Sequence, residues 1–230
     1  MGDLHRLIAF DLDGTLIDSR RDLADSANAL VVELGGSPLP EDAVARMVGE
    51  GASLLVRRAL TAAGIEEPAD AVARFLEFYN TRLLNHTRLY PGIVDLIREA
   101  REHARVVVLT NKPKQPTTQI LDGLGLLDLF DDVVGGDGPL PRKPDPAALV
   151  ALMDSAGAER RTTLMIGDSP IDYQTAINAK VQCCIVAFGF GFTNFRPEHA
   201  LPEEWVAADA TAVAERIRSF ASASSTEASG

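Results

Sequence analysis

The sequence is poor in cysteine and in long apolar runs. Among its 230 residues are two cysteines, Cys183 and Cys184, which are neighbours in an apolar segment. A disulfide framework is therefore excluded, and a buried strand is the expected setting for both thiols. No apolar run approaches the roughly 18 residues that a membrane-spanning helix needs, and a strand-like segment begins by Leu7 without a preceding signal-peptide pattern. We therefore expect a cytoplasmic protein with no membrane partner.

Positive charge is also scarce. The chain has 22 Lys and Arg residues against 33 Asp and Glu residues, and its formal net charge is −11. Because nucleic acids and anionic lipids are bound by positive surfaces, we expect no nucleic-acid partner. The hydrophobic content of 46% is enough for a globular core. If the substrate is an anion, a divalent cation and a few well-placed lysines or N–H groups must reverse the local field.

Short apolar runs bounded by turns alternate with helix-like segments along the chain. The runs are Leu7–Phe10, Val106–Leu109, Val133–Val134, Leu164–Ile166 and Cys184–Phe188. This alternation predicts an α/β fold with a Rossmann-like parallel sheet as its core. The first four runs end in polar or glycine-rich residues, and ligands bind at the carboxyl ends of strands in such sheets. We therefore expect these polar residues to converge on one site.

The stretch from residue 19 to residue 90 has no clear strand and is typical of amphipathic helices separated by glycine-rich turns. The predicted helices are Asp22–Leu34, Glu41–Val48, Ser53–Ala63 and Ala69–Leu84. A crossover of this length predicts a small all-helical cap domain, inserted after the first strand, that covers the converging residues. The catalytic core would comprise residues 1–18 and 91–219, and the Ser- and Ala-rich residues 220–230 are expected to form a disordered tail.

Two segments place carboxylates directly after predicted strands. FDLDGT puts Asp11 and Asp13 before a glycine turn, and LMIGDSPID contains Asp168 and Asp172. One carboxylate of the first pair can attack phosphorus while the other acts as general acid and base. Asp168, with Asp172 as a ligand or as an orienting residue, would complete an oxygen-rich site that suits Mg²⁺. Taken alone, the first segment is more typical of an ordinary strand-to-turn junction, and the second is more typical of a helix N-cap.

Two further segments carry groups that can bind anions. VVVLTNKP places Thr110 and Asn111 at a strand end, and PRKPDP places Lys143 between prolines in a constrained loop. A hydroxyl and backbone N–H groups can hold phosphoryl oxygens, and Lys143 can neutralise charge on both nucleophile and phosphate. We expect Asn111 to contribute to substrate binding. Taken alone, Thr110 is more typical of an ordinary strand end, and Lys143 is more typical of a solvated loop lysine.

Together and in this order, the four segments resemble the motifs of the haloacid dehalogenase superfamily, from about Leu7 to Phe192. The paired aspartates resemble those of its phosphatases and phosphomutases. The resemblance implies that Asp11 is the nucleophile, that Asp13 is the general acid and base, and that Thr110 binds phosphate. Lys143, from the PRKPDP segment, would share this phosphate-binding role.

The same resemblance implies a Mg²⁺ cofactor. Its metal ligands would be the Asp11 carboxylate, the Asp13 backbone carbonyl and the Asp168 carboxylate. Asp172 would support them, either as a direct ligand of the metal or as a residue that orients the ligands.

Within the superfamily, the helical insertion is similar to the cap of the phosphoglycolate phosphatase branch. The segments VGEGASLLVRRAL, GGD and GFGF are each similar to segments of that branch. By this resemblance Gly49 and Gly51 form a flexible loop that faces the core site, and Arg58 on the next helix reaches a substrate carboxylate. A solvent-facing helix position fits Arg58 equally well. The expected substrate is a small phosphorylated metabolite, with 2-phosphoglycolate as the leading candidate.

Other functions stay open on the sequence alone. A sugar phosphomutase would use the same core residues, and pyrophosphatase and 5'-nucleotidase activities are near neighbours. A non-enzymatic binding protein fits less well, because every position needed for the two-step mechanism carries a competent residue. We expect a monomer or a homodimer.

Overall fold

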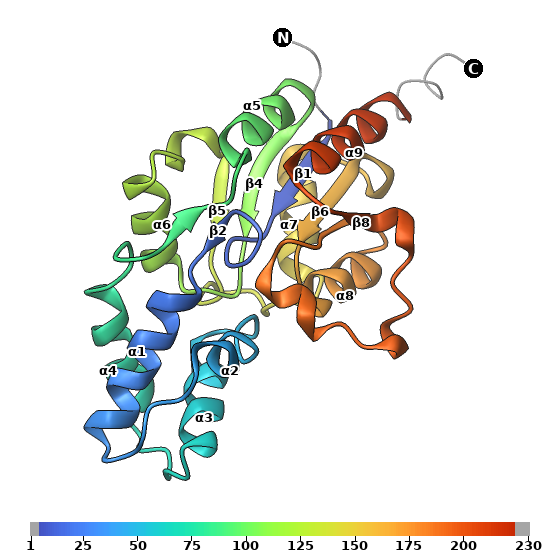
Figure 1. Cartoon of the computed structure of the whole chain (residues 1–230). Coiled ribbons are helices and arrows are strands. Elements are labelled where there is room, and N and C mark those ends of the chain that lie inside the picture. Colours follow the sequence, from blue (N-terminus) through green and yellow to red (C-terminus); the bar gives the residue numbers. More distant parts are fainter. Residues whose placement is uncertain (1–4, 224–230) are drawn as a thin grey trace.

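The computed structural model describes residues 5–223, and a parallel sheet forms its centre (Figure 1). This six-stranded sheet has the order β5-β4-β1-β6-β7-β8, and every neighbouring pair in it is parallel. Its strands are β1 (Leu7–Phe10), β4 (Arg105–Leu109), β5 (Asp132–Val134), β6 (Thr163–Gly167), β7 (Gln182–Val186) and β8 (Val206–Ala207). The predicted α/β fold with a parallel sheet is confirmed.

Helices cover both faces of the sheet. Those that follow the insertion are α5 (Ile93–His103), α6 (Lys114–Gly123), α7 (Ala147–Ala156), α8 (Pro170–Ala179) and α9 (Ala210–Ala223). Phe10 and Val108 share one apolar cluster with residues of α5, α6 and α9, whereas Ala9 and Val107 share a second cluster with residues of α7 and α8. Because both faces are buried, the strands read as continuous apolar runs in the sequence.

A separate group of helices lies beyond the carboxyl ends of the strands (Figure 1). These helices are α1 (Arg20–Glu33), α2 (Glu41–Ala45), α3 (Ala52–Ala62) and α4 (Ala71–Asn80). The chain enters and leaves the group through an antiparallel pair, β2 (Ile17–Asp18) and β3 (Arg88–Leu89). The prediction of no strand between residues 19 and 90 is therefore wrong at β3, because a strand of two residues is too short to show an alternating pattern.

Several predicted limits differ from the observed ones. β7 starts and ends two residues earlier than predicted, and the short β8 was not predicted. The expected disordered tail is wrong for residues 220–223, because α9 continues to Ala223 and Phe220 packs in the core with 2% exposure. The rest of that tail, 224–230, lies outside the described residues. Within residues 5–223, no helix has the length and apolar character of a membrane span.

Candidate active site

The first two carboxylates stand where β1 ends. Asp11 extends the parallel ladder, since its N–H donates to the Ile166 carbonyl at 2.8 Å. Gly14 has a φ of +88°, a left-handed conformation that suits glycine, and it turns the chain directly after Asp13. The Ser19 hydroxyl donates to the Asp13 carboxylate at 2.6 Å. The side chains of both aspartates line one cavity.

This cavity lies between the carboxyl ends of the strands and the helical insertion. From the core it is lined by Thr110 and Asp168, and from the insertion by Leu55, Phe75 and other apolar residues. The predicted convergence is therefore present for the residues that follow β1, β4 and β6, whereas Gly135 and Gly136, which follow β5, line a different cavity. A ligand in the cavity would touch charged groups on one side and apolar side chains on the other.

Lys143 lies between two carboxylates. Its Nζ is 2.8 Å from Asp11 and 2.6 Å from Asp172, and its side chain is 2% exposed. Burial acts to lower the pKa of Lys143, but the two carboxylates outweigh burial and raise that pKa above its ordinary value. The second oxygen of Asp172 accepts hydrogen bonds from the Ser169 N–H and hydroxyl, at 3.1 and 2.6 Å. Both oxygens of Asp172 are thus engaged, an arrangement that favours Asp172 as the residue that orients Lys143.

Glycines surround the Asp168 carboxylate. Its Oδ2 accepts a hydrogen bond from the Gly191 N–H at 2.7 Å, and its side chain is buried. A Cβ atom at Gly14 would lie 1.9 Å from that oxygen, and one at Gly189 would lie 2.3 Å from the Asp168 Cβ. Any side chain at either glycine would displace the carboxylate. The GFGF segment, which contains Gly189 and Gly191, is predicted from the sequence only as a family feature, and its contact with Asp168 is visible only in the structure.

The carboxylates form a cluster that fits a hard cation. Oxygens of Asp11, Asp168 and Asp172 lie within 4.8 Å of one another. Burial raises the pKa of Asp11 to about 6 against the opposing effect of Lys143, and burial also raises the pKa of Asp168 well above its ordinary value. A divalent cation would favour the ionised carboxylates, and oxygen donors are the ligands that Mg²⁺ prefers. The donor set therefore fits the predicted metal.

The two residues that follow β4 have different environments. Thr110 lines the cavity, and its N–H donates to the Val134 carbonyl at 3.0 Å. Asn111 also lines the cavity, but its side-chain N–H₂ donates to the Gly49 and Lys143 carbonyls, at 2.9 Å each. In this conformation Asn111 ties a loop of the insertion to the core.

The insertion residues predicted to bind substrate are only partly brought to the cavity. Gly49 and Gly51 line it, with φ values of +120° and +91°. Arg58, the third insertion residue predicted to bind substrate, is not among the described residues that line the cavity. Its guanidinium pairs with Glu50 and donates to the Met47 carbonyl at 3.2 Å. A contact between Arg58 and substrate therefore stays a prediction.

Sequence reasoning missed Lys112. Its Nζ is 2.9 and 3.0 Å from the two Asp13 oxygens and 4.5 Å from the centroid of the Tyr79 ring in α4. Burial acts to lower the pKa of Lys112, but Asp13 and Tyr79 together outweigh burial and raise that pKa above its ordinary value. Burial raises the pKa of Tyr79 to about 12. The sequence does contain one indication that Lys112 belongs to the site: it directly follows Thr110 and Asn111, the two polar residues assigned to the site.

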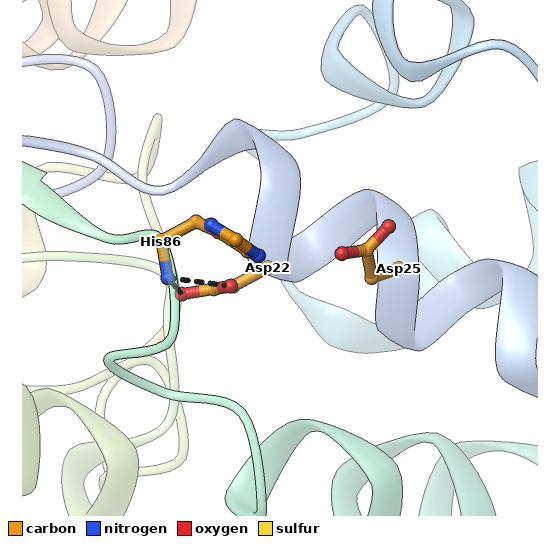
Figure 2. Close-up of side chains that lie close together, drawn as sticks. All are labelled: Asp22, Asp25 and His86. Atoms are coloured by element: carbon orange, nitrogen blue, oxygen red, sulfur yellow. Dashed lines mark hydrogen bonds between the residues drawn. The ribbon is translucent and has the colours of Figure 1, made fainter.

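A second group of acidic residues lies at the start of α1 and has a structural explanation (Figure 2). The buried Asp22 carboxylate accepts the His86 N–H at 2.9 and 3.0 Å. It also accepts the Thr87 N–H and hydroxyl, each at 2.8 Å. Asp25 and the His86 ring lie nearby and are exposed. Asp22 thus fastens α1 to the segment by which the chain returns to the core.

Comparison with known proteins agrees with this geometry. The sequence model of the family described as "Haloacid dehalogenase-like hydrolase" matches residues 8–186. The chain belongs to this family. A protein of Rhodospirillum rubrum named phosphoglycolate phosphatase is 45% identical over 80% of each chain. One from Pseudomonas putida with the same name is 40% identical over 85% of this chain and 74% of the relative.

A solved structure supports the same assignment. It is described as a predicted phosphoglycolate phosphatase from Haemophilus somnus, and it superposes with a TM-score of 0.85 at 29% identity. The superposition covers 94% of this chain and 99% of the other. The resemblance inferred from the motifs is confirmed, and with it the expectation of a phosphatase-type enzyme of this family.

Proposed function

We propose that this chain is a magnesium-dependent phosphomonoester hydrolase that acts on 2-phosphoglycolate through an aspartyl-phosphate intermediate. The observation that carries the proposal is the Lys143 ammonium, 2.8 Å from Asp11 and 2.6 Å from Asp172, with Asp168 in the same cluster. A dianionic phosphate would be repelled by Asp11 alone. The ammonium offsets this repulsion and can contact both nucleophile and phosphate.

In the first step an Asp11 oxygen attacks phosphorus, and the bond from phosphorus to the ester oxygen breaks. Asp13 gives a proton to the leaving oxygen. The Thr110 hydroxyl and the Lys143 ammonium hold the phosphoryl oxygens while charge develops. Bound Mg²⁺ would supply further positive charge toward the phosphate, with Asp11, Asp168 and the Asp13 backbone carbonyl as its ligands.

In the second step Asp13 takes a proton from a water molecule, which attacks the phosphorus of the aspartyl phosphate. The bond from phosphorus to Asp11 breaks, inorganic phosphate leaves, and both aspartates return to their starting states. Asp172 serves as the residue that holds Lys143 in place, a role supported by the hydrogen bonds to both of its oxygens.

The helical insertion, residues 19–90, acts in this proposal as a cap domain on the core. Two contacts support this role: Phe75 and Leu55 wall the cavity, and Asn111 donates to the Gly49 carbonyl at 2.9 Å. Closure would keep bulk water away during the first step, and opening would release the products. The Gly49 and Gly51 loop would move with the cap.

The choice of substrate follows from the names of the relatives at 45% and 40% identity. The test is phosphate release by the purified protein with Mg²⁺, comparing kcat/KM for 2-phosphoglycolate, hexose phosphates, nucleoside monophosphates and pyrophosphate. A preference for 2-phosphoglycolate supports the proposal, whereas tenfold higher activity on another substrate would refute this assignment and leave the core chemistry standing. Interconversion of sugar phosphates without phosphate release would indicate a mutase.

A cytoplasmic location and a monomeric or homodimeric state stay predictions. Light scattering coupled to size-exclusion chromatography would decide the second of these.

A further inference from the structure

The cavity contains a lysine to which the proposed reaction gives no role. Lys112 lies in the loop after β4, and its side chain is 4% exposed. Of the described residues that line the cavity, Lys112 is the one with a cationic side chain. The other buried lysine at the site, Lys143, is held between Asp11 and Asp172. Lys112 is thus a cation in contact with the cavity and distinct from the one beside the nucleophile.

Lys112 is enclosed between the core and the insertion. Its ammonium contacts both Asp13 oxygens, at 2.9 and 3.0 Å, and lies over the Tyr79 ring. Phe75 stacks on Tyr79 with ring centroids 5.8 Å apart and an angle of 7° between the ring planes. An ammonium with an aromatic wall on one side is partly removed from water, and charge pairs made there are stronger than pairs on the surface.

Among the described residues, those from the insertion that line the rest of the wall carry no charged side chain. Its side chains in the cavity include Leu23, Val48, Leu55 and Leu76. A substrate that has its phosphate at Asp11 and carries a second anionic group must bury that group close to these residues. An unpaired carboxylate in apolar surroundings costs several kcal/mol, so it requires a cation.

The chemistry of the substrate places its carboxylate beside Lys112. In 2-phosphoglycolate the leaving oxygen and the carboxylate are attached to the same carbon atom. Asp13 must reach that leaving oxygen in order to protonate it. Because the Lys112 ammonium is within 3.0 Å of the Asp13 oxygens, a carboxylate attached to the carbon that carries the leaving oxygen lies within reach of Lys112.

We propose that Lys112 is the residue that binds the substrate carboxylate and so sets the preference for a phosphomonoester with a second anionic group. Its ammonium exchanges a hydrogen bond to Asp13 for one to the substrate carboxylate and keeps its contact with Tyr79. The inference rests on the proposed function, because it names the group by which this site distinguishes 2-phosphoglycolate from other phosphomonoesters.

The test compares 2-phosphoglycolate with 2-hydroxyethyl phosphate, in which a neutral alcohol replaces the carboxylate. For Lys112→Met we expect kcat/KM on 2-phosphoglycolate to fall about 100-fold relative to that on 2-hydroxyethyl phosphate, mainly through KM, as for loss of a buried charge pair. Lys112→Arg should retain part of the preference. The matched control is Lys114→Met, because Lys114 is exposed at the start of α6, two residues after Lys112, and its substitution should leave the ratio unchanged.

Equal losses on both substrates would mean that Lys112 only supports Asp13, and would overturn the inference. A wild-type enzyme that hydrolyses both substrates equally well would also overturn it. If Lys112→Met does not fold, Lys112→Gln is measured instead. If neither substrate is hydrolysed, the proposed function fails, and calorimetry on the Asp11→Asn protein tests this inference separately. The inference is supported if Asp11→Asn binds 2-phosphoglycolate more tightly than 2-hydroxyethyl phosphate and if adding Lys112→Met removes this difference. A difference that persists in the double variant would overturn it.

Discussion

Binding of Mg²⁺ should stabilise the folded protein, and more at neutral than at acidic pH. Burial raises the pKa of Asp11 from 3.8 to about 6. The folded protein therefore binds more protons than the unfolded chain between about pH 4 and about pH 6, and without metal its stability falls as pH rises through this window. A rise of about 2 pKa units corresponds to about 3 kcal/mol. A cation at the carboxylates would offset this cost.

The expected change can be measured by thermal denaturation. At pH 7.5 and a Mg²⁺ concentration of about 100 times Kd, binding adds about 2.7 kcal/mol, or roughly 5–10 °C in Tm for a chain of this size. At pH 5.0 Asp11 is about nine-tenths protonated, so the apparent affinity falls about tenfold and the rise in Tm about halves. Asp168→Asn should abolish the rise, whereas Asp154→Asn, at an exposed position of α7, should preserve it.

Equal rises in Tm at the two pH values, or an unchanged rise in Asp168→Asn, would refute the assignment of these carboxylates as the metal site. The readout does not depend on turnover. It therefore tests the cation site separately from the choice of substrate.

Three further changes test other parts of the structure. Asp11→Asn should lower kcat by about 10⁴-fold or more with an unchanged circular dichroism spectrum. It should also prevent beryllium fluoride and Mg²⁺ from forming an acyl-phosphate mimic at this position. Appreciable residual activity would overturn the assignment of Asp11 as the nucleophile. Asp22→Ala removes a buried acceptor of four hydrogen bonds, so we expect a loss of about 3 kcal/mol in denaturant unfolding; a loss under about 1 kcal/mol would contradict the fastening role. Arg58→Ala tests the predicted substrate contact through KM, and an unchanged KM would exclude that contact.

The parallel sheet was predictable because each strand is buried on both faces and is bounded by turn residues. The pattern did not reveal β3 or β8, which have two residues each and gain their order from partners far along the chain, as in the pairing of Val206 with Ile185. The end of α9 was mispredicted for a related reason. Composition indicated a tail, but a single apolar side chain, Phe220, has its place in the core.

The candidate site was predictable wherever a functional group directly follows a strand. Asp11, Thr110 and Asp168 are such residues, and the sheet brings them to one cavity. Lys112 and the glycines around Asp168 were missed because their roles depend on contacts across the fold. The sequence alone does not reveal that Tyr79, from a helix of the insertion, lies against Lys112.

The acidic composition and the binding of an anion are compatible because the site balances its charges locally. The aspartates Asp11, Asp13, Asp168 and Asp172 face the ammonium groups of only Lys112 and Lys143 in the described contacts. Asp13 must carry a proton to act as general acid, so the other three carboxylates and the two ammonium groups leave a formal charge of −1, which one Mg²⁺ would change to +1. The phosphate dianion would then enter a site of net positive charge whose cations can exchange partners. A basic surface is therefore unnecessary, and the net charge of −11 is compatible with a small phosphorylated substrate.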